Sequence, residues 1–136
     1  MKAISYTLTI ESKGSYLHAT VQGENGRETV LAYFEEIRAA CVARDCYRVL
    51  IEERLTGPRF PLEELYQLAT ELSTRAGPTY EALAYVDVNA EGDTIQQVVS
   101  MVVDPGSATG VFATVAEAER WLRAKEQGPP VDRADR

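Results

Sequence analysis

Histidine and cysteine are scarce in this chain of 136 residues, which contains one histidine and two cysteines. A structural zinc site needs about four such ligands at characteristic spacings, so His18, Cys41 and Cys46 do not form one. A disulfide between the two cysteines would be unusual in a cytosolic chain. We therefore interpret both thiols as core or bystander residues and expect neither a metal nor a cofactor.

Positive charge is missing from a long stretch, because no Lys or Arg occurs between Arg75 and Arg120 whereas seven acids do. These acids are Glu81, Asp87, Glu91, Asp93, Asp104, Glu117 and Glu119. With a formal net charge of −7 the chain has no basic footprint to displace the counterions of DNA or RNA, so no nucleic-acid partner is expected. The acidic half forms either a solvated face or, through Glu91, Asp93 and Asp104, a face for a cationic protein partner.

Long apolar runs are also absent. No run approaches the ~18 residues of a membrane span, and the start, "MKAISYTLTIES", has neither a long apolar stretch nor the cleavage site of a signal peptide. We expect a cytoplasmic protein with one domain over residues 1–126, a size that buries roughly 68% of the surface of the unfolded chain. The end, "QGPPVDRADR" (127–136), has no packing pattern and is predicted to be a disordered tail.

Catalytic and phosphate-binding motifs are missing as well. The sequence has no glycine-rich phosphate loop, and no Ser/His/Asp arrangement suggests itself. The segment "DVNAEGDTIQQV" (87–98) superficially resembles a calcium loop, but Val98 stands where a bidentate glutamate is needed. These absences favour a protein that is not an enzyme.

Two alternating segments open the chain. Residues 5–11 and 16–22 each place an apolar residue at every second position, which is typical of a strand with one buried face. Lys13-Gly14 between them predicts an antiparallel hairpin. Tyr16 and His18 fall on the more polar face beside threonines, where we interpret the histidine as a surface residue.

Helical and strand patterns then alternate. The predicted helices cover residues 26–44, 61–76, 94–103 and 115–126, and the predicted strands cover residues 47–53, 80–88 and 110–114. The order ββαβαβαβα implies right-handed crossovers between parallel strands. We therefore predict an α/β domain with a single mixed sheet of about five strands that begins with the antiparallel hairpin.

The predicted core face of each helix follows from its apolar spacing. In the helix 26–44 this face contains Val30, Phe34, Ile37 and Cys41, with Leu31 and Tyr33 beside it. In the helix 61–76 it contains Leu62, Leu65, Leu68, Ala69 and Leu72. Tyr33, Tyr66 and Tyr85 are interpreted as aromatics at the edge of the core, or alternatively as the lining of an apolar pocket. The adjacent glutamates at 35–36, 52–53 and 63–64 are interpreted as solvated charges.

Helix starts are candidate anion sites because their free N–H groups favour negative charge. Three of the four predicted helices have capping-box spacing, with Asn25 and Glu28, Asp93 and Gln96, and Thr114 and Glu117 as the pairs. The helix 61–76 begins instead at Phe60-Pro61, and the Phe60 side chain cannot accept a hydrogen bond. Its start is therefore the one predicted helix start without a polar cap.

This start lies within "IEERLTGPRFPLEEL" (51–65), where a predicted strand runs through a loop into a helix. The candidate binding residues here are Arg54, Thr56, Gly57, Arg59 and Phe60. The arginines would attract an anion, whereas the glutamates at 63–64 in the first helical turn would repel it. Three interpretations stay open: a structural corner, a surface for a partner protein or small ligand, and a phosphorylated Thr56.

The end of the domain, "TGVFATVAEAERWL", together with the order of elements, resembles the STAS/SpoIIAA-like domains. The residues that carry the likeness are Val111, Phe112, Glu117, Ala118, Trp121 and Leu122. The stretch "LHATVQGENGRETV" is similar to the second strand, glycine and first helix of that family. The likeness spans most of residues 4–124 and implies the SpoIIAA-like α/β fold.

The resemblance implies a regulatory or interaction module that binds a partner protein and has no catalytic role. In family members that antagonise anti-sigma factors, a kinase phosphorylates a serine in the turn after the third strand. The matching stretch "ERLTGPRF" has no serine, and Thr56-Gly57 is its nearest approximation. Other relatives resemble Sec14-type domains, which implies a carrier of a lipid or another small apolar ligand as the alternative. A homodimer through an exposed edge of the hairpin is a further expectation.

Overall fold

The structure is a computed structural model that describes residues 6–58, 60–74, 80–87 and 109–127. The elements are β1 (Tyr6–Ser12), β2 (Leu17–Glu24), α1 (Arg27–Arg44), β3 (Arg48–Thr56), α2 (Leu62–Thr74), β4 (Ala82–Asp87), β5 (Thr109–Phe112) and α4 (Val115–Gln127). The five strands form one sheet in the order β1-β2-β3-β4-β5. β1 and β2 are antiparallel, and the other neighbouring pairs are parallel. The predicted mixed α/β sheet with its starting hairpin is confirmed, while the predicted helix 94–103 lies outside the described residues.

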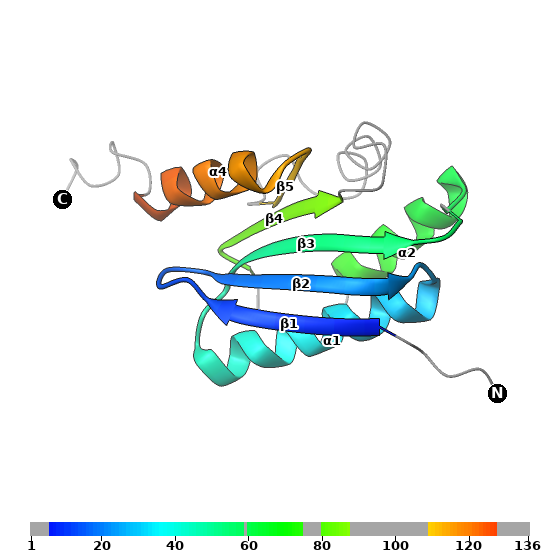
Figure 1. The fold of residues 1–136 in the computed structure, drawn as a ribbon, viewed down its shortest axis with the longest axis horizontal. Helices are drawn as coiled ribbons and strands as arrows, with labels where there is room; N and C mark the ends of the chain where they lie inside the picture. The colour runs from blue at the N-terminus through cyan, green and yellow to red at the C-terminus, as the bar shows by residue number, and fades with distance from the viewer. Residues whose placement is uncertain (1–5, 59, 75–79, 88–108, 128–136) are drawn as a thin grey trace.

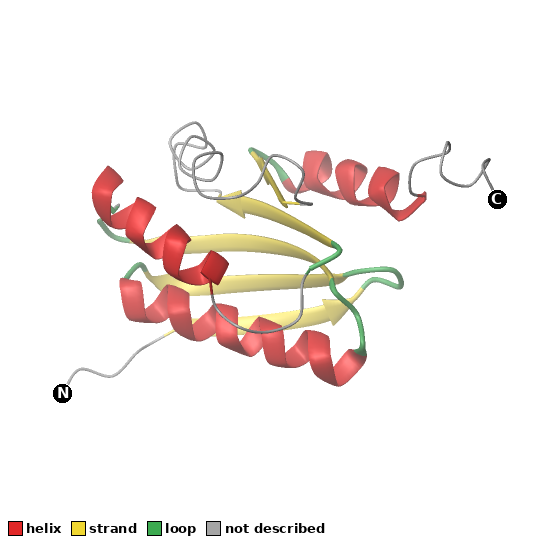
Figure 2. Cartoon of the chain, turned by 180° about the vertical axis from the view of Figure 1, so that it is seen from behind, coloured by secondary structure: helices red, strands yellow, loops and turns green. Residues whose placement is uncertain are grey.

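Helices cover both faces of the sheet. α1 and α2 lie together on one face, in front of the strands in Figure 2, and α4 packs on the other face near β4 and β5 (Figure 1). Side chains of β3 alternate between the two faces of the sheet and contribute to a hydrophobic core on each face. Val49 and Ile51 face α1 and α2, whereas Leu50 faces α4. Ala84 and Leu83 of β4 divide in the same way, which confirms the predicted burial of this strand on both sides.

The hairpin turns at Gly14, whose φ of 91° lies in the region that favours glycine. The Lys13 N–H donates to the Tyr16 carbonyl at 2.8 Å and closes the turn. Tyr16 lies on the predicted face, opposite Leu17 and Ala19, but this face is not polar there, because the Tyr16 side chain is buried under α4. Its hydroxyl donates to Glu119 Oε2 at 2.9 Å, so a residue just before β2 fastens the hairpin to the last helix.

The core face of α1 is centred on Tyr33. The buried side chains are Val30, Tyr33, Ile37 and Cys41, whereas Phe34 is only half-buried. The prediction that Phe34 lies on the core face with Tyr33 beside it is therefore wrong, because Tyr33 is the more buried of the two aromatics. Tyr33 is three residues after Val30 and four before Ile37, which places all three side chains on one side of the helix. The rings of Tyr33 and Phe34 stack with their centroids 5.0 Å apart.

The two described capping boxes have different outcomes. In α4 the N-cap half of the prediction is confirmed, because the Glu117 N–H donates to the Thr114 hydroxyl at 3.2 Å, and this hydroxyl in turn donates to the Glu117 carboxylate. In α1 the prediction is wrong, because Gly26 is the N-cap residue and no side chain caps the helix. Asn25 instead bonds to the segment after β3, which brings two loops together at the carboxyl ends of the parallel strands.

Candidate functional site

The turn after β3 is held by contacts with the loop after β2. β3 continues through Arg54 to Thr56, so the predicted end of this strand at residue 53 is wrong. The backbone N–H of Asn25 donates to the Thr56 carbonyl at 2.7 Å, and the Asn25 side chain donates to the Pro58 carbonyl at 2.9 Å. The Thr56 hydroxyl donates to the Gly23 carbonyl at 3.3 Å. These bonds fix the two loops side by side at the carboxyl edge of the sheet.

Gly57 determines the path of the chain out of β3. Its φ of 106° lies where an L side chain is strained. A Cβ built at this position would have room, since the Asn25 nitrogen would be 3.9 Å away. The backbone conformation, and not crowding, therefore requires glycine here.

The predicted binding residues do not converge on one point. Arg54 is exposed on the sheet face that also carries α4, and it pairs there with a neighbouring glutamate. Phe60 is half-buried and packs against the core under α1 and α2, on the opposite side. Thr56 and Gly57 are exposed in and just after the end of β3. The other candidates, Arg59, Glu91, Asp93 and Asp104, lie outside the described residues.

Two large apolar side chains are exposed at the start of α2. Leu62 is 53% exposed, and Tyr66, one turn later, is 42% exposed. The predictions that Leu62 lies in the core and Tyr66 at its edge are therefore wrong. At 3.6 residues per turn, Leu62 is about 120° and Tyr66 about 160° around the helix from the buried Leu68. This angular offset in the sequence indicates that both side chains point away from the core. We call Leu62, Tyr66 and the turn residues 56–58 the β3–α2 corner.

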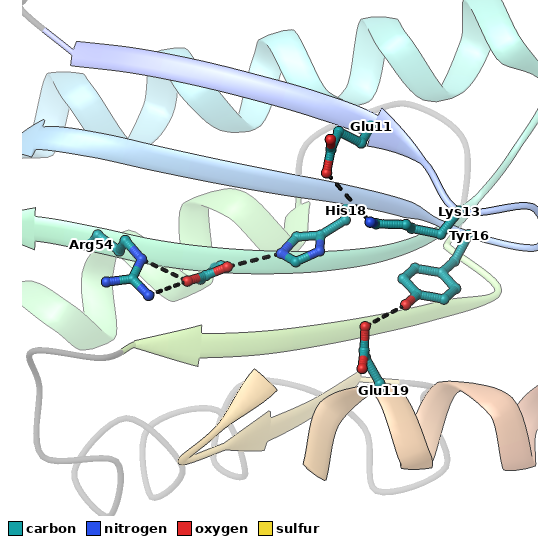
Figure 3. Close-up of polar contacts among 7 residues, drawn as sticks. Glu11, Lys13, Tyr16, His18, Arg54 and Glu119 are labelled. Atoms are coloured by element: carbon teal, nitrogen blue, oxygen red, sulfur yellow. Dashed lines mark hydrogen bonds and ion pairs between the residues drawn. The ribbon is translucent and has the colours of Figure 1, made fainter. Parts of the chain in front are cut away.

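A chain of hydrogen-bonded polar side chains crosses β2 and β3 on the face that carries α4 (Figure 3). Glu52 Oε1 lies 2.9 Å from His18 Nε2, and Glu52 Oε2 lies 2.6 Å from Arg54. Burial alone raises the pKa of Glu52, but hydrogen bonds from His18 and Arg54 outweigh it and hold the pKa below its usual value. His18 has a side chain that is only 13% exposed, so its interpretation as a surface residue is wrong.

Glu53 points to the opposite face, toward α1. Its residue exposure is 2%, and that of Asp87, its register partner on β4, is 6%. The Tyr33 hydroxyl of α1 donates to Glu53 Oε2. Tyr85, two residues before Asp87 and half-buried, also hydrogen-bonds Glu53. We call Tyr33, Glu53, Tyr85 and Asp87 the carboxyl cluster.

The interpretation of the glutamates at 52–53 as solvated charges is wrong. Adjacent residues on a strand point to opposite faces, and both faces of β3 pack against helices, so both glutamates are buried, with exposures of 8% for Glu52 and 2% for Glu53. Burial raises the pKa of Glu53 to about 7, the charge of Asp87 adds to this rise, and the Tyr33 hydrogen bond opposes it. The apolar neighbours Ile51 and Leu55 were the signal in the sequence that this part of the strand is buried.

A shallow hollow of about 310 Å³ lies at the other end of the sheet, where Ser12, Arg44, Tyr47 and Glu81 contribute to a mainly polar lining.

Across the described ranges, no group of three or more His, Cys, Asp or Glu side chains could hold a metal ion. None of the helices in those ranges is long and apolar enough to cross a membrane.

No protein-family model matches the chain, and a search of the curated proteins finds no match. The predicted resemblance to STAS/SpoIIAA-like domains therefore depends on the order of elements and on the stretches "LHATVQGENGRETV" and "TGVFATVAEAERWL". Within the second stretch, Phe112 and Trp121 pack with ring centroids 5.3 Å apart, and Leu122 is fully buried. These residues have a structural role at the junction of β5 and α4.

Proposed function

We propose that this chain is a STAS/SpoIIAA-like interaction module that binds a partner protein through the β3–α2 corner. The observation that carries the proposal is the joint exposure of Leu62 and Tyr66 on successive turns of α2. Exposed apolar side chains that lie together mark interaction surfaces, and aromatic anchors supply much of the energy of such interfaces. The corner therefore offers a leucine and a tyrosine as the centre of a contact.

The shape of the corner favours a protein over a small molecule. Small ligands bind in concave pockets that enclose most of their surface, whereas Leu62 and Tyr66 project from the outside of a helix. Glu63, which is also exposed, lies beside them, and the whole chain has a formal net charge of −7. A partner with an apolar patch bordered by basic residues would complement this surface.

The corner is also prepared for binding by its own hydrogen bonds. The bonds from Asn25 to Thr56 and Pro58 hold the turn that leads into α2. A surface that is already ordered loses less conformational entropy when a partner binds. The partner therefore meets a turn and a helix start that are already in place.

A photo-crosslinking amino acid at position 62 or 66 tests the proposal in cell extract, with position 42 as the matched control. Val42 is 51% exposed on α1 and lies outside the corner. We expect one protein to crosslink from positions 62 and 66 but not from position 42.

Binding of that protein by the double variant Leu62→Ser/Tyr66→Ser provides the second measurement. We expect its affinity to fall by a factor of ten or more, because both anchors are lost, while Val42→Ser binds like the wild type. Equal crosslinking from all three positions, or an unchanged affinity of the double variant, would contradict the proposal.

A further inference from the structure

The carboxyl cluster is an unusual feature for the core of a small domain. Two carboxyl groups, Glu53 and Asp87, lie next to one another in register on neighbouring strands, and both are buried. Two carboxylates cannot both be charged in such a place without a large penalty from desolvation and mutual repulsion. A shared proton removes this penalty, since a protonated carboxyl group can donate to the neighbouring carboxylate.

We propose that the Glu53–Asp87 pair holds one proton near neutral pH, and that loss of this proton loosens the packing of α1 against the carboxyl end of β3. The bound proton is placed on Glu53, because Asp87 and burial both favour the protonated form of that residue. The resulting device responds to pH in the neutral range, where most buried groups do not change their charge. It operates whether or not the β3–α2 corner binds a partner.

The groups around Glu53 support this assignment. Tyr33 faces it from α1, Tyr85 and Asp87 face it from β4, and Val21 is its register partner on β2. The groups with the largest effects on its pKa are thus two tyrosines and an acid, and none of these is a cation. Burial raises the pKa of both tyrosines well above its ordinary value, so their hydroxyls stay protonated.

Two charged groups on the helices that cover this face are paired with one another. Glu71 of α2 forms an ion pair with Arg27 of α1. Tyr6 of β1 donates its hydroxyl to Glu36 of α1, also on this side of the sheet. Arg27 is therefore neutralised by Glu71 and does not supply a counter-ion to the carboxyl cluster.

The position of Glu53 explains how a lost proton would change the structure. Its hydrogen bond to Tyr33 joins the middle of α1 to β3, and Thr56 follows three residues later in the same strand. The bond between the Thr56 hydroxyl and the Gly23 carbonyl lies at the end of this strand. The Tyr33 bond favours the ionised carboxylate, so the force that displaces it is repulsion from Asp87. A shift of Glu53 away from Asp87 would alter both the α1 contact and the turn at the carboxyl edge.

Carbon-13 NMR of the carboxyl groups in the full chain, from pH 5 to pH 9, measures the proton directly. We expect one glutamate signal that is absent from Glu53→Gln to titrate near neutral pH. Nitrogen-15 amide shifts of Tyr33, Leu55 and Thr56 should follow the same titration. A Glu53 carboxyl that is already ionised above about pH 5.5, as its ordinary pKa of 4.5 would require, or amide shifts that stay constant through the titration, would overturn the proposal.

Three variants distinguish the effect of the Glu53–Asp87 pair on the titration from the effect of burial alone. Asp87→Asn should move the Glu53 titration to lower pH, because it removes a neighbouring negative charge. Glu53→Gln mimics the protonated acid, so its amide shifts should stay constant over the same pH range. Glu24→Gln is the control, because Glu24 is exposed at the same edge, and it should titrate like the wild type at Glu53. If a variant fails to fold, the wild-type titration decides alone.

The proton also links pH to stability. A pKa raised from 4.5 to about 7 means that the folded state keeps the proton while the unfolded state has lost it. The contribution of Glu53 is therefore fully present below pH 4.5 and is lost as the pH rises toward and through 7. We expect the unfolding equilibrium constant to rise by a factor on the order of a hundred across this range, relative to Glu53→Gln. A parallel pH dependence of the two proteins in urea would also overturn the proposal.

Discussion

Two consecutive glutamates on β3 show how strongly the surroundings of one residue decide its charge. Glu52 lies between His18 and Arg54, which hold its pKa below the usual value against the effect of burial. Glu53 has Tyr33 and Asp87 as partners, and burial raises its pKa to about 7. The pKa values of identical side chains one residue apart are therefore shifted in opposite directions, because a strand sends them to opposite faces.

The Tyr33 hydroxyl is predicted to stabilise the fold and to lower the pKa of Glu53. Tyr33→Phe removes a buried hydrogen bond, so the free energy of unfolding should fall by about 1 kcal/mol at pH 5.5. The pH at which Glu53 titrates should rise, because the lost bond favoured the carboxylate. Urea unfolding and carboxyl NMR measure the two effects. The control is Tyr66→Phe on the exposed ring, and an equal loss of stability in both variants would contradict the assigned role.

The two cysteines are predicted to differ in reactivity. Cys41 is buried, and burial raises the pKa of its thiol to about 11. At pH 8 only about one Cys41 thiol in a thousand would be ionised, and thiolates are the reactive form. Iodoacetamide should therefore alkylate the half-buried Cys46 first, as mass spectrometry of peptides would show. In Cys46→Ser, alkylation should require denaturant, and rapid modification of the native variant would contradict the buried position of Cys41.

At the scale of elements, the helix starts differ in how their backbone N–H groups are satisfied. α4 has a capping box formed by Thr114 and Glu117. The N-cap position of α1 is Gly26, and the nearby Asn25 side chain bonds to Pro58 instead. The same sequence spacing therefore leads to a helix cap in one place and to a bridge between loops in the other.

The capping box of α4 is predicted to contribute measurably to stability. Thr114→Ala removes the oxygen that accepts the Glu117 N–H, so the free energy of unfolding should fall by about 1 kcal/mol. Thr114→Ser keeps the hydroxyl and should remain close to the wild type. Thermal unfolding followed by circular dichroism distinguishes the two variants. Equal stability of Thr114→Ala and Thr114→Ser would show that the cap contributes nothing.

The turn after β3 gives a second prediction at this scale. Gly57→Ala forces a side chain into a φ of 106° and should lower the free energy of unfolding by roughly 1–3 kcal/mol. Gly57→Asn should lower it less, because asparagine tolerates positive φ better than alanine. Urea unfolding measures both. If alanine were tolerated as well as asparagine, the turn would not depend on its backbone conformation.

Sequence patterns predict the strands and helices of this chain well, because buried residues recur at a regular spacing along each of these elements. Apolar residues at every second position in β1 and β2, such as Leu17 and Ala19, identify the hairpin and its buried face correctly. Side-chain partners are harder to predict, because they come from segments far apart in the chain. Nothing near Glu53 in the sequence indicates that Tyr33 and Asp87 would enclose it, or that Tyr16 would be covered by α4. The sequence therefore locates the turn between β3 and α2, but it does not indicate which side chains from distant segments meet around it.

At the scale of the whole molecule, β1 and β5 are the outer strands of the described sheet. β1 is seven residues long, and no described strand pairs with its outer edge. Exposed strand edges are templates for pairing with another chain. A second copy of this chain, with its own β1 in antiparallel orientation, remains a predicted partner for this edge.

Light scattering of the purified chain over a wide range of concentrations tests this pairing. A two-fold arrangement centred on Thr9 would place Thr9 opposite its copy and Glu11 opposite Thr7, so like charges would not meet. Thr9→Lys would place two lysines together and should shift the mass from dimer to monomer. A monomeric mass of the wild type at all concentrations would exclude the dimer.

The order of strands in space is the order of strands in the chain, β1-β2-β3-β4-β5. During synthesis on the ribosome, each new strand can therefore join the strand that was completed just before it, without waiting for a distant segment. Sheets built from such near-neighbour pairings close shorter loops and fold faster than sheets with long crossings. The hairpin can provide the first edge for this growth, and α4, the last described element, can then cover Leu50 and Tyr16 on the face opposite to α1 and α2.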